Sequence, residues 1–334
     1  MTNLSHIKTA KKLLLASLLP AMMLTGCGGG DSSSGSGTVS FSLTDAPIDS
    51  AKEVWITITG LSVQQGDDEW EDFVFDVPKK IDLLTLQGVQ KESLLSEEPL
   101  PSGEYTQIRL DVVLDDPKED PADYDTYIVT NDGVPHVLAG PSFEQTGLKI
   151  VAEDSLSVPE NGHVAFTIDF DVRKSIVAQG NGEYKLKPVL RIEQDNSIGH
   201  IEGTVGATLM SECIAPENTG DTTYVASPVV YAFNGTYDLL ELEGIEEVSS
   251  SLISYNSDSS AYEFEVGYLP AGSYSVAFNC VISETTTNAE TGEVTTTDTN
   301  DYRAVEPVEV FEGEITTGVS LEVPADPAPE EPAA

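Results

Sequence analysis

Cysteine, histidine and basic residues are all scarce in this sequence of 334 residues. It has three cysteines and four histidines, and neither a C-x-x-C pair nor an H-E-x-x-H pattern is present, so the usual zinc-site spacings are missing. Lys and Arg number 16 against 57 Asp and Glu, and the formal charge of −41 repels nucleic acid and anionic lipid head groups. These shortages argue against a zinc enzyme and against a nucleic-acid-binding protein.

The sequence also lacks the short motifs that mark common enzyme classes. It has no G-x-S-x-G elbow for a serine nucleophile, no phosphate-binding loop and no dinucleotide fingerprint. Ser and Asp are so abundant that a triad chosen by eye would carry no information. We therefore predict a protein that is not an enzyme and has no catalytic residue, no cofactor and no metal centre.

Long apolar runs are missing too, apart from Leu13–Leu24 near the start. This run is shorter than the about 20 apolar residues that span a bilayer. Three lysines precede it and Leu24-Thr25-Gly26-Cys27 ends it, which is the layout of an export signal with a cysteine at the cleavage position. The segment resembles a bacterial lipoprotein signal. The resemblance implies removal of residues 1–26 and acylation of the Cys27 thiol and the new N-terminus.

The residues after the cysteine predict where the protein is held. Gly28 stands where an Asp would signal retention at the inner membrane, so the resemblance implies lipid anchoring in the outer membrane, facing the periplasm or the surface. Several acyl chains give firm anchoring. Residues 27–37 are rich in Gly and Ser and predict a flexible tether. Loss of the leader leaves 13 basic against 57 acidic residues, a formal charge of about −44.

Alternating apolar and polar residues predict an all-β protein with two β-sandwich-like domains in tandem. Val54, Ile56 and Ile58 show the alternation, and Gly, Asn and Asp clusters separate such segments. The predicted domains are 38–195 and 198–324, and the Pro-, Ala- and Glu-rich tail 325–334 is expected to be disordered. Leu83–Ser96 is the one helix candidate, interrupted by Gly88.

Cys213 and Cys280 are expected to form one disulfide, because the export signal implies an oxidising compartment. Cys280 shares the apolar face of a predicted strand with Val276 and Phe278. Cys213 points into the same core if the strand predicted at Ile198–Leu209 continues that far.

A short motif occurs in both halves, as Leu100-Pro101-Ser102-Gly103-Glu104-Tyr105 and as Leu269-Pro270-Ala271-Gly272-Ser273-Tyr274. The repeat predicts the same turn into a strand in both halves.

Several motifs of the first half resemble one family of bacterial lipoprotein domains. Residues 38–193 resemble the domain-of-unknown-function family numbered 4382, which implies a β fold and an export address but no reaction or ligand. The resemblance rests on Ser42-Leu43-Thr44-Asp45-Ala46-Pro47, Ile81-Asp82-Leu83-Leu84-Thr85-Leu86-Gln87-Gly88, Ile108-Arg109-Leu110, Ile168-Asp169-Phe170-Asp171-Val172 and Lys185-Leu186-Lys187-Pro188-Val189-Leu190-Arg191.

The second half resembles the carboxypeptidase-regulatory-like or prealbumin-like sandwiches. This resemblance rests on Ile201-Glu202-Gly203-Thr204-Val205, on the Leu-Pro-Ala-Gly-Ser-Tyr turn and on Val319-Ser320-Leu321-Glu322-Val323. It implies a support or a carbohydrate-binding-like module, since a fold does not fix a function.

Carboxylates are the only candidate site residues. Asp45, Asp169 and Asp171 together form a candidate ligand or cation site, or an acid–base pair. The favoured interpretation is that Asp169 and Asp171 line a wet strand face near two basic residues and that Asp45 caps a turn. The acidic run Asp115–Asp125 leaves weak Ca²⁺ binding as an alternative to a solvated loop, and Trp55 and Trp70 leave sugar stacking open.

These observations predict a non-catalytic outer-membrane lipoprotein that binds or scaffolds a glycan or a protein partner in the cell envelope. No nucleic acid is expected as a partner. Two alternatives stay open: an envelope hydrolase that uses Asp/Glu pairs, and a Ca²⁺-stabilised, adhesin-like structural module. Asp45, Asp169 and Asp171 gathered in a concave pocket would favour the hydrolase, and carboxylates scattered over convex faces would favour the binding protein or scaffold.

Overall fold

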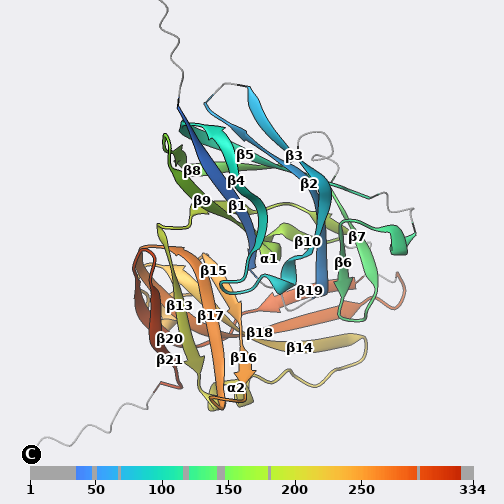
Figure 1. Ribbon diagram of the computed structural model, residues 1–334. Helices are drawn as coiled ribbons and strands as arrows, with labels where there is room; N and C mark the ends of the chain where they lie inside the picture. The colour runs from blue at the N-terminus through green and yellow to red at the C-terminus, as the bar shows by residue number, and fades with distance from the viewer. Residues whose placement is uncertain are drawn as a thin grey trace, which may run out of the picture. The chain divides into compact units, whose positions relative to one another are not determined.

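The computed structural model describes residues 35–46, 51–66, 69–115, 120–140, 147–179, 182–291 and 294–324 (Figure 1). The predicted leader, Cys27, most of the tether and the predicted tail lie outside these residues. The described chain is nearly all β-strand, as the alternation predicted, and its sheets form sandwich-like arrangements. None of its helices is long and apolar enough to cross a membrane.

Two sheets made from residues 36–194 share one hydrophobic core. Sheet A has the order β12-β9-β1-β4, and sheet B has the order β10-β11-β7-β6-β2-β5-β8 with β3 paired to β2. The bounds in sheet A are β1 Ser36–Ala46, β4 Glu92–Pro101, β9 His163–Asp171 and β12 Leu190–Gln194. Those in sheet B are β2 Ala51–Gln64, β3 Trp70–Asp82, β5 Gly103–Val112, β6 Tyr127–Thr130, β7 Pro135–Ala139, β8 Leu148–Val158, β10 Ile176–Ala178 and β11 Tyr184–Leu186.

Two further sheets made from residues 198–321 share a second core, which includes Val230, Val266 and Phe278. Sheet C has the order β16-β17-β13-β21; sheet D has the order β15-β14-β18-β19, with β20 also paired to β18. The bounds in sheet C are β13 Ile198–Val205, β16 Ser254–Asn256, β17 Ala261–Pro270 and β21 Ile315–Leu321. Those in sheet D are β14 Thr222–Asn234, β15 Ser249–Leu252, β18 Gly272–Thr287, β19 Val294–Thr299 and β20 Tyr302–Val310.

The cores follow the alternation in the sequence. Val54, Ile56 and Ile58 of β2 are buried with exposed fractions of 1%, 2% and 0%. In β9 the large apolar residues are buried, and so are Thr167 and Asp169 between them. β9 pairs in parallel with β1 in an unbroken register from Thr38 opposite His163 onward. The first sandwich is therefore closed by a pairing between segments about 125 residues apart.

The repeated Leu-Pro turn connects two consecutive strands in both halves, as predicted. It joins β4 to β5 in the first half and β17 to β18 in the second. The Tyr105 hydroxyl donates to the Pro101 carbonyl, and the Tyr274 hydroxyl donates to the Pro270 carbonyl, each at 2.8 Å. Each buried tyrosine thus satisfies its polar end on the turn from which its own strand starts.

Two local predictions, of which the first allowed only a turn or two of helix, agree with the structure in part. Leu83–Ser96 holds only the 3-10 turn η1 Leu83–Thr85, and β4 begins at Glu92, because Gly88 has a φ of +66° and the chain turns there. The predicted strand Ile198–Leu209 ends at Val205, and α2 Ala207–Glu212 follows and buries Leu209. The other short helices are η2 Pro121–Asp123, α1 Val172–Ser175 and η3 Leu239–Glu241.

The predicted disulfide between Cys213 and Cys280 is present. The element that brings Cys213 to Cys280 differs from the expectation, because Cys213 lies at the end of α2 and not in a strand. Cys280 is fully buried in β18, so the bond fastens α2 to the middle of sheet D. The bridge closes a loop of 67 residues.

Removing this disulfide should destabilise the fold. A Cys213→Ala/Cys280→Ala variant should lose about 4 kcal/mol of unfolding free energy, because the unfolded chain regains the entropy of the open loop. Urea unfolding monitored by far-UV circular dichroism measures the loss. Reduced wild-type protein is the control, and a variant as stable as the oxidised wild type would contradict this role for the bond.

Candidate functional site

The three carboxylates singled out in the sequence lie at the same end of two neighbouring strands. In the parallel pairing of β1 with β9, Thr44 lies opposite Asp169, Asp45 opposite Phe170, and Ala46 opposite Asp171. Paired residues share a face of the sheet. Asp45 therefore points to the core side with Phe170, and Asp169 points to the other side.

Asp45 is a buried carboxyl with one unused oxygen. Its side chain is 4% exposed; Oδ1 accepts a hydrogen bond of 3.2 Å from the Val172 N–H, and Oδ2 has no partner among the described residues. Burial raises the pKa of Asp45 well above its ordinary value, and the negative charge of Asp169 raises it further. Asp45 belongs to β1, and the turn at Pro47 that it was expected to cap lies outside the described residues.

Asp169 is held by an ion pair on the opposite face of sheet A. Its Oδ2 lies 2.6 Å from Nε of Arg191, which β12 brings alongside β9. Asp169 is only 4% exposed, so it does not line a wet face. The alternation identified which residues share this face, but not that another segment would cover it.

Residues 86–91 form that cover. The Thr44 hydroxyl lies within hydrogen-bonding distance of the carbonyls of Leu86 and Gln90, at 3.1 and 2.8 Å. Lys91 lies 2.6 Å from Asp195, whose other oxygen accepts from the Thr167 hydroxyl at 2.7 Å. A polar network therefore fills this face, and solvent does not.

Asp171 is a helix cap. Its Oδ1 accepts the Lys174 N–H at 3.0 Å at the start of α1, and Lys174 Nζ lies 3.6 Å from Oδ2. Burial raises the pKa of Asp171, while the cap hydrogen bond and the Lys174 charge act in the opposite direction. The three carboxylates are therefore neighbours, but each faces a different partner.

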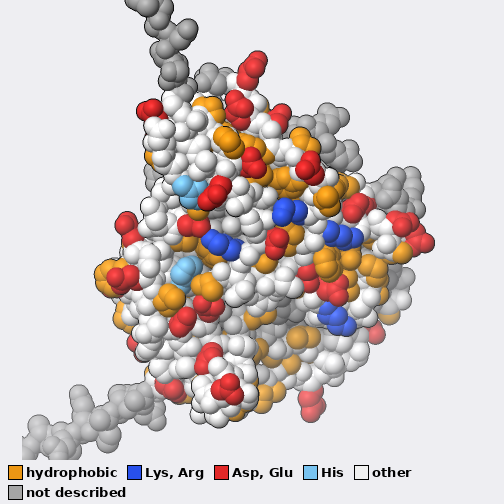
Figure 2. Space-filling model, in the orientation of Figure 1, with side chains coloured by type: hydrophobic (Ala, Val, Ile, Leu, Met, Phe, Trp, Pro, Cys, Tyr) orange, Lys and Arg blue, Asp and Glu red, His pale blue; other side chains and the backbone are white. Residues whose placement is uncertain are grey.

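No three His, Cys, Asp or Glu side chains gather closely enough to hold a metal ion anywhere in the described ranges. The acidic run Asp115–Asp125 lies only partly within them, since 116–119 are outside. Both carboxylate oxygens of Asp115 accept backbone N–H groups, from Asp125 and Thr126, at 2.7–3.0 Å. Elsewhere, Asp and Glu are spread over the visible face of the molecule and do not form one patch (Figure 2).

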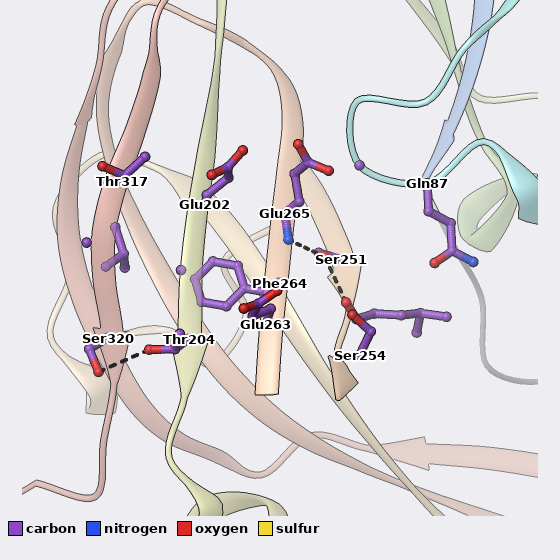
Figure 3. Close-up of a pocket in the computed structure, with 15 residues that line it drawn as sticks. Gln87, Glu202, Thr204, Ser251, Ser254, Glu263, Phe264, Glu265, Thr317 and Ser320 are labelled. Atoms are coloured by element: carbon purple, nitrogen blue, oxygen red, sulfur yellow. Dashed lines mark hydrogen bonds between the residues drawn. The ribbon is translucent and has the colours of Figure 1, made fainter. Parts of the chain in front are cut away.

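A groove lined by polar side chains lies over sheet C. Its volume is about 600 Å³, and it is bounded by β13, β17, β21 and the Gln87–Gly88 segment (Figure 3). Three carboxylates line it: Glu202, Glu263 and Glu265. Figure 3 shows Glu202 and Glu265 side by side on neighbouring strands, where they are direct cross-strand partners.

Like charges opposite each other make this groove strongly negative. Burial raises the pKa of Glu265, and the nearby Glu202 raises it further, against a backbone N–H of Val89 that lowers it. Hydrogen bonds from Ser259 and Asn256 lower the pKa of Glu263. Among the described residues, the lining has three acidic side chains and no basic one, so the groove attracts cationic groups.

Hydroxyl groups complete the groove. Thr204 and Ser320 lie 3.4 Å apart, and the Ser251 hydroxyl accepts the Glu265 N–H at 3.0 Å. Phe264 also lines it but is 4% exposed, so no open aromatic ring is offered for sugar stacking. The arrangement offers oxygen acceptors to ammonium, guanidinium or hydroxyl donors.

Sequence reasoning missed this groove. Glu263 and Glu265 alternate with Phe264 and Val266, so their outward direction was readable from the period of two. Glu202 was quoted only as part of a fold motif. The arrival of Gln87 and Gly88 over sheet C depends on contacts between distant segments, such as the 2.9 Å bond from the Tyr268 hydroxyl to the Val89 carbonyl.

One family model matches the first half. Residues 36–188 match the family described as "Domain of unknown function (DUF4382)". This confirms the resemblance stated for that half, over a little less than half of the chain. A comparison with curated proteins finds no match.

Solved structures give only remote likenesses. The Bacillus anthracis TIE protein is 14% identical with a TM-score of 0.18, and the match covers 86% of this chain but 34% of that one, about a third of its length. The major pilin from Streptococcus pyogenes is 9% identical with a TM-score of 0.15, covering 86% of this chain and 97% of that one. At such low TM-scores these likenesses carry no argument about function.

The buried Asp45 carboxyl predicts a pH-dependent stability. Its pKa is raised in the folded state, so the folded protein holds a proton that the unfolded chain releases near pH 4, and stability falls as pH rises from there toward the folded pKa. Asp45→Asn keeps the acceptor for Val172 without the charge. The variant should therefore gain stability over wild type as pH rises from about 4 to 7.

Urea unfolding at several pH values measures this gain. The exposed Asp76 gives the matched control, Asp76→Asn, which removes the same charge from a solvated position. An Asp45→Asn curve that runs parallel to wild type across this range would contradict the prediction.

Proposed function

We propose that this protein is a non-catalytic, lipid-anchored outer-membrane lipoprotein that binds or scaffolds a protein partner in the cell envelope. One observation carries the proposal: each of the three carboxylates that the sequence singles out makes a structural contact within the fold. Asp45 accepts a backbone N–H, Asp169 holds Arg191, and Asp171 caps α1. A general acid or base must instead reach the proton of a bound substrate.

The groove over sheet C supports the choice of partner. Its carboxylates and hydroxyls are acceptors, and it lacks an exposed ring, so a segment rich in Lys or Arg fits it better than a neutral glycan. In this proposal residues 198–324 form a support of the carboxypeptidase-regulatory-like or prealbumin-like type, and they carry the binding surface.

The anchor is tested by replacing the acylated cysteine. Cys27→Ala should release the protein from outer-membrane fractions or leave an uncut precursor, because no thiol remains to be acylated. Fractionation and intact-mass measurement distinguish the two results. If the variant is still found as mature protein in the outer membrane, the proposed anchor is wrong.

Binding in the groove is tested with an oligolysine peptide as probe. A Glu202→Gln/Glu263→Gln/Glu265→Gln variant should bind it more weakly by about 1–2 kcal/mol, roughly tenfold in Kd, and with a smaller dependence on salt. Isothermal titration calorimetry measures both. The control, Glu69→Gln/Glu71→Gln/Asp76→Asn, removes three exposed acids from another part of the chain.

Equal weakening by the control would show that only the general negative field attracts the peptide. A neutral oligosaccharide tested in parallel covers the glycan class. Binding of the oligosaccharide and not of the peptide would overturn the proposed partner.

A further inference from the structure

Three strands of sheet D extend past the second core as a ribbon, in which Ala226 and Ile282 at the base pack against that core. We call it the threonine tongue: residues 222–226 of β14, 282–287 of β18 and 294–299 of β19 (Figure 1). None of these residues is buried, and every residue of β19 is exposed. Strands that bury no apolar face gain little from packing, so the tongue needs another reason to stay ordered.

Threonine rows cross the tongue on both faces. Thr223, Thr285 and Thr296 are successive cross-strand partners in one row, and Thr222, Thr286 and Thr295 form the next. The hydroxyls of Thr285 and Thr296 lie 3.0 Å apart. Such ladders of β-branched residues make a flat, regular surface whose side chains already pair with one another.

The outer edge of the tongue is β19, which pairs only with β18 in the described chain. Its register with β18 has no bulge. The long edge strands β3, β4, β8, β20 and β21 all carry register shifts, and three of them contain Pro: Pro78 in β3, Pro99 and Pro101 in β4, and Pro307 in β20. The remaining edge strands β10, β12, β15 and β16 are five residues or fewer.

Bulges, prolines and short length are the usual protections of a sheet edge against pairing. β19 has none of them, and it has no Lys or Arg. Five of its six residues are β-branched, and its one charge, Asp298, accepts a hydrogen bond of 2.6 Å from Ser283. In a chain of formal charge −41, this edge is both regular and nearly uncharged.

We infer that β19 pairs antiparallel with β19 of a second copy of this chain across a two-fold axis. The edge is self-complementary when Thr296 lies opposite its own copy. The threonine row of one tongue then continues into the row of the other, and Asp298 faces Val294 of the second copy. The two Asp298 carboxylates are then about 14 Å apart along the strands, beyond the screening length of about 8 Å at physiological salt.

A second copy fits this edge better than a different partner. An isologous contact needs one surface that complements itself, and the sequence Val-Thr-Thr-Thr-Asp does so around its central Thr. The contact is small and the chains repel through their net charge. Self-association should therefore be weak at low salt and become stronger as salt screens the repulsion.

Sedimentation velocity of the detergent-solubilised full chain tests the dimer. Wild type should form a dimer whose share rises with protein and NaCl concentration. Thr296→Lys should abolish it by placing two ammonium groups opposite each other, while Thr285→Lys, in the same row of the inner strand, should leave it intact. A wild type that stays monomeric, or a dimer unaffected by Thr296→Lys, overturns the inference.

Cross-linking tests the register independently of that substitution. Thr296→Cys should form an intermolecular disulfide in dilute oxidant, since Thr296 lies opposite itself. Thr295→Cys should not, because it lies opposite Thr297. Equal cross-linking of both variants, or none by Thr296→Cys, contradicts the proposed pairing. Melting temperatures confirm that each variant is folded.

Discussion

The parallel pairing of β1 with β9 is the contact on which the first sandwich and its polar centre depend. It joins segments about 125 residues apart, so the loop-closure cost is met before its hydrogen bonds form. Once it forms, β12 adds to β9 and brings Arg191 to Asp169, and β4 adds to β1. Sheet A then has an apolar face toward sheet B and a polar face that residues 86–91 cover.

Three of the few basic residues join segments that are distant in the sequence. Lys91 links the covering segment to Asp195, at the end of the first half. Lys174 of α1 reaches Glu246 and Glu247 of the second half as well as Asp171, and the Arg173 guanidinium lies 4.4 Å from the ring centre of Tyr231. In a chain with 16 basic residues, these cations hold distant segments together.

The faces of the strands were predictable from the sequence, and what covers them was not. The period of two identified the buried Val54, Ile56 and Ile58 and placed Asp169 on the opposite face of β9 from Phe170. It could not show that residues 86–91 would cover Asp169, since that cover depends on hydrogen bonds between residues more than 40 apart. The alternation of apolar residues suggested that Cys213 and Cys280 point into one core. It did not predict α2, which begins after Gly206, where the strand has ended at Val205.

The groove over sheet C could not be predicted from the sequence for the same reason. Each of its acidic residues has the expected outward direction, but a groove needs the second wall that Gln87 and Gly88 supply. The threonine tongue is the opposite case. Its rows can be read from the threonine-rich runs around Thr285 and Thr296 once the hairpin register is known, because no tertiary cover intervenes.

The central claim is that the acidic cluster stabilises the fold. A double-mutant cycle on Asp169 and Arg191 tests it most directly, with unfolding free energies from urea titration. The account predicts that Asp169→Asn alone costs about 3 kcal/mol by leaving a partly buried guanidinium unpaired, and that Asp169→Asn/Arg191→Met recovers much of it. A cycle with no coupling, in which Asp169→Asn leaves stability unchanged, would contradict the account.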